Sequence, residues 1–320
     1  MGDPTLAGMP AISDLVLGTM YFGTRLDERA SFALLDRFVE AGGTTVDTAN
    51  CYAFWESGTG HGGQSEAVIG RWLAANPGVR EQLVVATKVG VEPSDDGGLE
   101  GLSDEVVERE CARSLDRLGI DRIDVYWAHG EDRTTDLEET VTAFGALVKN
   151  GLVARLGVSN HATWRVERGR RLAARLSVEP WTVLQLTTSY VEPRPGADVP
   201  GKDHRFGFVS EETRDYVESH PEIELWAYSP LIQGAYDRTD RPLPQVYEHP
   251  GTTARLSALA RVAEQHGVAP SQVVLSWMMT SPPRSRPIVG VSSLEQLDSA
   301  LGAAGLELSP EELAGLDAPR

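Results

Sequence analysis

Four residues near the ends of strand-like runs in the first half of the chain have side chains that could do acid–base chemistry. Asp47, Lys88 and His129 each end a short run of β-favouring residues, and Tyr52 follows Asp47 by five positions. If the three runs are neighbouring strands of one parallel sheet, their carboxyl ends meet at one edge. We therefore expect the four side chains to converge at a single site.

The chemistry of such a site follows from the residue types. A lysine ammonium inside a protein needs a carboxylate, and Asp47 supplies one for Lys88. A free tyrosine titrates near 10, so moving its pKa toward neutrality requires about 4 kcal/mol, which one close cation in a partly dry site can supply. Tyr52 could then give a proton to a developing alkoxide while His129 orients the carbonyl. The competing interpretation is a structural ion pair between Asp47 and Lys88 beside an unrelated tyrosine and histidine.

Strand-like and amphipathic helical runs alternate along almost the whole chain. The expected strands are 15–19, 44–47, 83–88, 123–129, 153–159, 183–185, 222–229 and 287–290. Eight of the expected helices are 27–41, 65–75, 103–118, 163–175, 211–219, 252–266, 270–280 and 293–304. Two more are expected from their N-terminal caps, one that begins with a Thr135/Glu138 capping box and a last one capped at Ser309. Eight β-then-α units without a linker predict an α/β fold, a single (β/α)8 TIM barrel domain over residues 1–320 with extra C-terminal helices.

A doubly wound sheet is the rival fold, and it requires a glycine-rich turn directly after an early strand. Gly58, Gly60 and Gly63 match G-x-G-x-x-G, but the preceding strand ends far upstream at Asp47, so we interpret them as a flexible loop. The connections 53–64 and 191–209 are unusually long. Long βα loops of a barrel usually carry function, so substrate specificity is expected there.

Composition narrows the possible partners and compartments. The 320 residues are 41% hydrophobic and 24% charged, with a formal charge of -18, which disfavours nucleic acid and anionic membrane surfaces as partners. The N-terminus shows no secretory signal, and no apolar run reaches the roughly 18 residues of a membrane helix. The two cysteines suggest reduced thiols in a cytoplasmic protein, and the seven histidines show no metal-ligand spacing, so no metal is predicted.

At this point the motifs resemble a known family, the aldo-keto reductases. Segments that look like its successive signatures occur in the family's order over nearly the whole chain. They are 46–52 (VDTANCY), 63–70 (GQSEAVIG), 85–90 (VATKVG), 124–129 (DVYWAH), 156–160 (LGVSN), Gln185, 228–231 (YSPL) and 288–297 (IVGVSSLEQL). Each piece is weak, but the combination is highly specific.

The resemblance implies a role for each matching residue. Tyr52 would be the general acid of carbonyl reduction, Lys88 and Asp47 the pair that tunes its pKa, and His129 the partner that orients the carbonyl. The positions that would lie against a nicotinamide cofactor are Thr19, Met20, Asp47, Ser159, Asn160, Gln185, Tyr228, Ser229, Pro230, Leu231, Gln233, Gly234, Arg238, Gly290, Ser292 and Gln296.

The chain departs from the family pattern at three places. Ser292 and Gln296 stand in a region where many members have a basic residue for the 2′-phosphate of NADPH, although Arg238 could contribute. Ala300 replaces a frequent adenine-contacting asparagine. The loop after Tyr52 is long, and Phe22 and Trp55 could form an aromatic wall for substrate.

The resemblance implies an NADPH-dependent aldo/keto reductase that transfers a hydride to an aldehyde or ketone, with NADH not excluded. Two alternatives stay open: an NAD(P)-binding regulatory subunit with little turnover, and an enzyme that oxidises a sugar or secondary-metabolite alcohol. The expected partner is a small-molecule carbonyl compound. The sequence identifies neither that compound nor the oligomeric state.

Overall fold

The computed structural model describes residues 10–94, 97–199 and 206–318 and forms a closed barrel of eight parallel strands in sequence order. The strands are β1 (Val16–Gly18), β2 (Thr45–Asp47), β3 (Val84–Val89), β4 (Ile123–Ala128), β5 (Val153–Ser159), β6 (Trp181–Thr187), β7 (Glu224–Tyr228) and β8 (Ser285–Gly290). Pairing of β8 with β1 completes the barrel, which confirms the predicted (β/α)8 fold.

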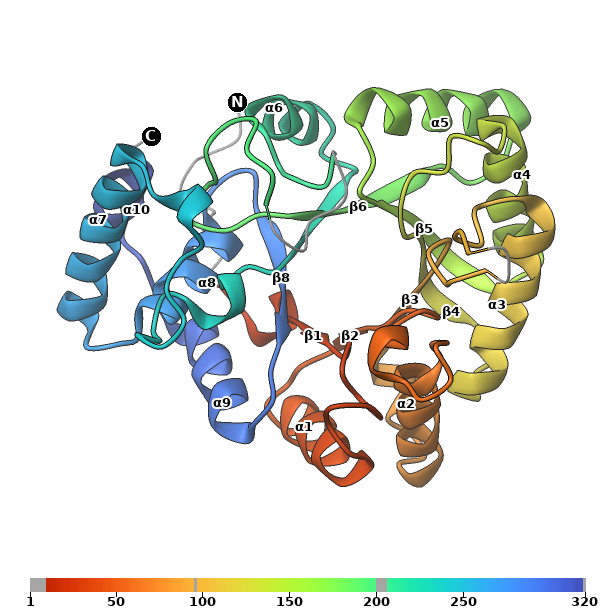
Figure 1. The fold of residues 1–320 in the computed structure, drawn as a ribbon, viewed down its shortest axis with the longest axis horizontal. Coiled ribbons are helices and arrows are strands. Elements are labelled where there is room, and N and C mark those ends of the chain that lie inside the picture. Colours follow the sequence, from red (N-terminus) through yellow and green to blue (C-terminus); the bar gives the residue numbers. More distant parts are fainter. Residues whose placement is uncertain (1–9, 95–96, 200–205, 319–320) are drawn as a thin grey trace.

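The helices lie around the outside of the strands (Figure 1). They are α1 (Glu28–Glu40), α2 (Gln64–Ala75), α3 (Asp104–Leu118), α4 (Leu137–Lys149), α5 (Thr163–Leu176), α6 (Glu211–Ser219), α7 (Pro250–His266), α8 (Pro270–Thr280), α9 (Leu294–Gly302) and α10 (Pro310–Asp317). The C-terminal helix α10 packs beside α7, as Figure 1 shows on one flank of the barrel. No helix within the described ranges has both the length and the apolar character needed to cross a bilayer.

Several element ends differ from the sequence prediction. Helix α4 begins after Asp136, whose carboxylate accepts from the Glu138 backbone, so the predicted Thr135/Glu138 capping box is wrong. The Thr135 hydroxyl donates instead to Asp132. The capping box of α10 at Ser309 is confirmed.

Two expectations fall on residues outside the described ranges. The expectation about the N-terminus depends on residues 1–9, and the long 191–209 connection includes residues 200–205.

Large apolar side chains fill the inside of the barrel beneath the carboxyl ends of the strands. Trp127 of β4 and Trp226 of β7 meet edge to face, with ring centroids 5.1 Å apart, among valines, an alanine and an isoleucine from other strands. The indole of Trp127 lies over Gly157 of β5, where an added Cβ would be 2.3 Å from Trp127 Cε3. A side chain at position 157 would therefore displace the tryptophan that supports the site.

We expect Gly157→Ala to lower the free energy of unfolding by about 1–3 kcal/mol, because the methyl group overpacks a rigid indole. Urea denaturation of the full chain measures this change. Gly305→Ala is the matched control, since an added Cβ there has no neighbour within 4 Å, and it should change stability by less than about 0.5 kcal/mol. Equal stabilities of the two variants would contradict the packing argument.

Candidate active site

A buried ammonium group lies near the carboxyl end of β3. Lys88, near the end of β3, is 0% exposed, and its Nζ donates to Asp47 Oδ2 at 2.5 Å, to the Thr48 carbonyl at 2.7 Å and to the Tyr52 hydroxyl at 2.5 Å. A lysine ammonium has three donors, so these three bonds satisfy it completely. The lysine thereby positions the phenol of Tyr52.

The carboxylate of Asp47 connects three strands around the lysine. Its Oδ2 also accepts from the Tyr52 hydroxyl at 3.3 Å, and its Oδ1 accepts from Gln185 Nε2 of β6 at 3.2 Å. Asp47 ends β2 and is itself buried. A buried ion pair is tolerated only where further hydrogen bonds satisfy both ions, and this one is satisfied from β2, β3 and β6.

Tyr52 and His129 lie above the ion pair and are only half-buried. Their rings meet edge to face, with centroids 5.9 Å apart, and Lys88 Nζ lies 4.4 Å from the centroid of the Tyr52 ring. The Asn160 side-chain amide donates to the His129 carbonyl at 3.0 Å. The structure thus brings together the four residues Asp47, Tyr52, Lys88 and His129, as the spacing of the strand ends predicts.

Burial dominates the protonation equilibria of this cluster. It raises the pKa of Asp47 and lowers the pKa of Lys88, while the attraction between the two ions opposes both shifts. Burial, followed by the charge of Asp47, raises the pKa of Tyr52 well above its usual value. The predicted lowering of the Tyr52 pKa by Lys88 is therefore wrong for this geometry, because desolvation and the carboxylate outweigh the ammonium. Tyr52 is a neutral phenol at physiological pH, which is the form that can give up a proton.

Polar side chains at the ends of β5 and β7 form a hydrogen-bonded network beside this cluster, whereas Gln185 of β6 donates to Asp47 of the cluster itself. The Tyr228 hydroxyl donates to Asn160 Oδ1 at 2.7 Å, and Asn160 Nδ2 donates to Ser159 Oγ at 3.1 Å. Asn160 has a positive φ of 58°, so its backbone takes the left-handed conformation that asparagine tolerates better than most residues. Ser159, Asn160 and Gln185 are buried, whereas Tyr228 is half-exposed.

The connection after β7 carries strained backbone. Ser229, Ile232 and Gln233 have φ values of 55°, 46° and 58°, although none is a glycine. Non-glycine residues with positive φ cluster at ligand clamps, because the surrounding structure must over-determine them. This strained turn, together with the amide and hydroxyl groups at the ends of β5 and β6, fits the polar, phosphate-bearing shape of a nicotinamide dinucleotide.

The other positions predicted to face a cofactor have different degrees of access. Thr19 is fully buried, and its hydroxyl donates to the Asp47 carbonyl, so its side chain supports β2 beneath the surface. Pro230 is also buried. The remaining predicted positions are exposed or half-exposed: Met20, Ser229, Leu231, Gln233, Gly234, Arg238, Gly290, Ser292 and Gln296. Arg238 is paired with Asp240 at 2.6 Å, and Gln296 Oε1 accepts from the Ser292 backbone.

The two aromatic residues predicted to line a substrate wall, Phe22 and Trp55, differ in their exposure to solvent. Phe22 is 1% exposed and packs in the core with Val68 and Leu35, so its assignment to the substrate wall is wrong. Its side chain points inward from the β1–α1 connection, a direction that spacing alone does not reveal. Trp55 is 51% exposed and meets Phe54 edge to face, so it is available at the surface of the long loop.

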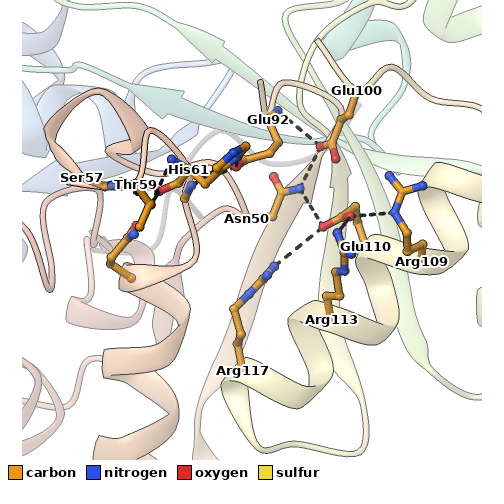
Figure 2. A network of polar contacts seen from close by, with 12 residues as sticks. Asn50, Ser57, Thr59, His61, Glu92, Glu100, Arg109, Glu110, Arg113 and Arg117 are labelled. Carbon is orange, nitrogen blue, oxygen red and sulfur yellow. Dashed lines mark hydrogen bonds and ion pairs between the residues drawn. The ribbon is translucent and has the colours of Figure 1, made fainter. Parts of the chain in front are cut away.

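Sequence reasoning missed the residues that hold the long loop 53–64 in place. Glu92 accepts from the Gly62 backbone at 2.9 Å and from His61 Nδ1 at 3.1 Å, and Glu100 accepts from Asn50 Nδ2 at 2.8 Å. Figure 2 shows Asn50 between Glu100 and Glu110, with arginines of α3 around Glu110. The only available signal was the position of Asn50 within the 46–52 segment.

Gly62 brings the end of this loop directly onto the stretch that precedes Tyr52. An added Cβ at position 62 would lie 2.2 Å from the Asn50 carbonyl oxygen and 2.5 Å from Cys51 Cα. Only glycine permits this approach, and the Glu92 carboxylate then fixes the Gly62 amide. The loop therefore covers the backbone of the residues just before Tyr52.

Known proteins resemble this chain over nearly its whole length. The model of the aldo/keto reductase family matches residues 14–319. The chain belongs to this family. An uncharacterized oxidoreductase, YrpG, from Bacillus subtilis is 30% identical over 96% of this chain and 91% of its own length. The aldo-keto reductase str7 of Strobilurus tenacellus is also 30% identical, over 97% of this chain and 89% of its own. Norsolorinic acid reductase stcV of Emericella nidulans is 30% identical over 96% and 78%.

Family membership establishes the general activity of this aldo/keto reductase. It is an NAD(P)H-dependent oxidoreductase that acts on carbonyl and alcohol groups of small molecules. The exposed mouth of the barrel, where Tyr52 and His129 lie, is where barrel enzymes build their active sites.

We expect Glu92→Ala in this reductase to speed hydrogen exchange at the Gly62 amide by about tenfold. The substitution removes the carboxylate that accepts the Gly62 N–H and so frees the C-terminal end of loop 53–64. Exchange measured by mass spectrometry on peptides spanning 57–64 tests this. Glu108→Ala on the exposed face of α3 is the control and should leave exchange in these peptides unchanged. Unaltered exchange in the Glu92 variant would show that this carboxylate does not hold the loop.

Proposed function

We propose that this protein is an NADPH-dependent aldo/keto reductase in which Tyr52 is the general acid. The observation that carries the proposal is the set of three hydrogen bonds from Lys88, one of which ends on the Tyr52 hydroxyl. A bound NAD(P)H supplies the hydride that the carbonyl carbon receives. The residues of the chain then have to bind the carbonyl, orient it and deliver a proton to its oxygen. We also propose that residues 1–320 act as one domain, because the barrel closes from β8 to β1.

The proton comes from Tyr52. As negative charge develops on the carbonyl oxygen, the neutral phenol transfers its proton and becomes a phenolate. Lys88 Nζ already donates to the phenol oxygen of Tyr52 at 2.5 Å. The negative charge of the phenolate therefore forms beside an ammonium group that does not have to move. Asp47 holds the ammonium in place, and the half-exposed His129 donates a hydrogen bond that orients the carbonyl.

The cofactor is proposed to lie along the carboxyl ends of β5 to β8. Ser159, Asn160 and Gln185 would hold the carboxamide, and Tyr228 would stack on the nicotinamide ring. The strained turn from Ser229 to Gly234, through Pro230, Leu231 and Gln233, would border the pyrophosphate. Gly290, Ser292 and Gln296 would face the adenosine end, with Thr19 and Met20 near the ring.

The substrate is proposed to be an aldehyde or ketone that contacts the loop bearing Trp55. Three further relatives are 26% to 28% identical to this chain. Two of them are named norsolorinic acid reductases, and the third is named an aryl-alcohol dehydrogenase. Aromatic carbonyl compounds are therefore the first substrates to screen. The aryl-alcohol dehydrogenase favours including the oxidative direction as a second candidate activity.

We expect Tyr52→Phe to fold and to bind cofactor normally but to lose turnover by about 10²–10⁴-fold, because the phenol oxygen is the proton donor. NADPH consumption with a panel of aldehydes and ketones measures the loss, and fluorescence titration measures cofactor binding. Tyr216→Phe on α6 is the matched control and should keep wild-type turnover. A Tyr52→Phe variant with near-wild-type activity would refute the assignment of the general acid.

Cofactor preference gives a separate test. If Arg238 meets the 2′-phosphate, Arg238→Gln should weaken NADPH binding by about fivefold and leave NADH binding unchanged, because only NADPH carries that phosphate. Separate calorimetric titrations with the two cofactors measure this. Arg241→Gln, another exposed arginine of the same loop, serves as the control. A parallel loss for both cofactors would argue against a 2′-phosphate contact at position 238.

A further inference from the structure

A cysteine lies against the histidine of the proposed active site. Cys51 directly precedes Tyr52 and is 3% exposed, and its thiol is free. Its Sγ lies 3.4 Å from Nδ1 of His129, which is within hydrogen-bonding distance for sulfur. The contact therefore joins the β2–α2 connection to the residue that follows β4.

The direction of this hydrogen bond follows from the chemistry of the two atoms. Burial raises the pKa of the Cys51 thiol, with the Glu92 carboxylate adding to the shift, so the sulfur keeps its proton. A thiol is a weak donor and a weaker acceptor, whereas the unprotonated nitrogen of a neutral imidazole is a good acceptor. The favourable arrangement is S–H donating to Nδ1.

We propose that Cys51 is a positioning residue, whose thiol holds neutral His129 in the tautomer that carries its proton on Nε2. A neutral imidazole has one donor and one acceptor nitrogen, so a bond accepted at Nδ1 places the N–H on Nε2. This nitrogen is on the side of the ring away from the buried sulfur. The inference rests on the proposed role of His129, which needs an N–H to donate to the substrate carbonyl.

Two other contacts fix the same imidazole. The Asn160 side chain holds the His129 carbonyl at 3.0 Å, and the Tyr52 ring meets the imidazole at an interplanar angle of 72°. With the backbone and one ring face held, the thiol at Nδ1 favours the proton on Nε2. The close approach of Gly62 to Cys51 Cα limits movement of the sulfur away from the ring.

The test uses Cys51→Ala, which removes the donor, and Cys51→Ser, which restores one. Long-range proton–nitrogen correlation spectra of the full-length protein report the tautomer of His129, assigned by the signals that His129→Gln removes. We expect a single Nε2–H tautomer in the wild type and a mixture in Cys51→Ala. We also expect kcat to fall by about tenfold in the alanine variant with KM little changed, and to recover most of that loss in Cys51→Ser.

Cys111→Ala is the matched control, because Cys111 is the other buried thiol and packs into the core from α3. It should keep both the wild-type kcat and the His129 tautomer. Within a His129→Gln background, Cys51→Ala should cause no further loss of kcat, because the two residues act through one hydrogen bond.

An Nδ1–H tautomer in the wild type would overturn the inference, even if the alanine variant fails to fold. An unchanged tautomer in Cys51→Ala would also overturn it, whatever happens to kcat, because the thiol would then act by packing alone. Wild-type activity in His129→Gln would instead count against the proposed function, while the tautomer measurement would still stand for Cys51.

Discussion

The site depends on the need to satisfy one ammonium group that has no access to water. Lys88 is fully buried, and taking an ion out of water costs several kcal/mol even after the structure relaxes. Its three protons must therefore end on oxygen atoms, and they end on Asp47, Thr48 and Tyr52. Two of these acceptors carry no net charge, so only the aspartate neutralises the lysine. The position of the phenol follows from the requirement to satisfy the lysine.

The site is consequently built in two levels. Asp47 and Lys88 lie below, where the low dielectric makes their interactions strong, and Tyr52 and His129 lie above, where a substrate can reach them. Trp127 and Trp226 pack against each other inside the barrel, and Trp127 of β4 is the register partner of Lys88 on β3. The reductase thus buries its ion pair and leaves the phenol and the imidazole half-exposed.

Much of this arrangement follows from the sequence, because side chains at the carboxyl ends of parallel strands must meet. That rule is sufficient to place Asp47, Lys88 and His129 together and to predict the barrel. It fails where the outcome depends on a side-chain direction or on a loop path. Phe22 points into the core, and the bonds of Glu92 to the long loop depend on how that loop returns. The Tyr52 pKa was predicted with the wrong sign, because residue types alone do not give the balance between burial, one cation and one anion.

The three acceptors of the Lys88 ammonium come from one short segment of the chain, apart from the two long connections. All three lie between positions 47 and 52, and none belongs to the connections 53–64 or 191–209. Insertions, deletions or grafted sequences in those two connections would remove no acceptor from the ammonium, provided that Gly62 keeps its close approach to Asn50 and Cys51. Laboratory redesign of this reductase would begin with those two connections and leave residues 47–52 as they are.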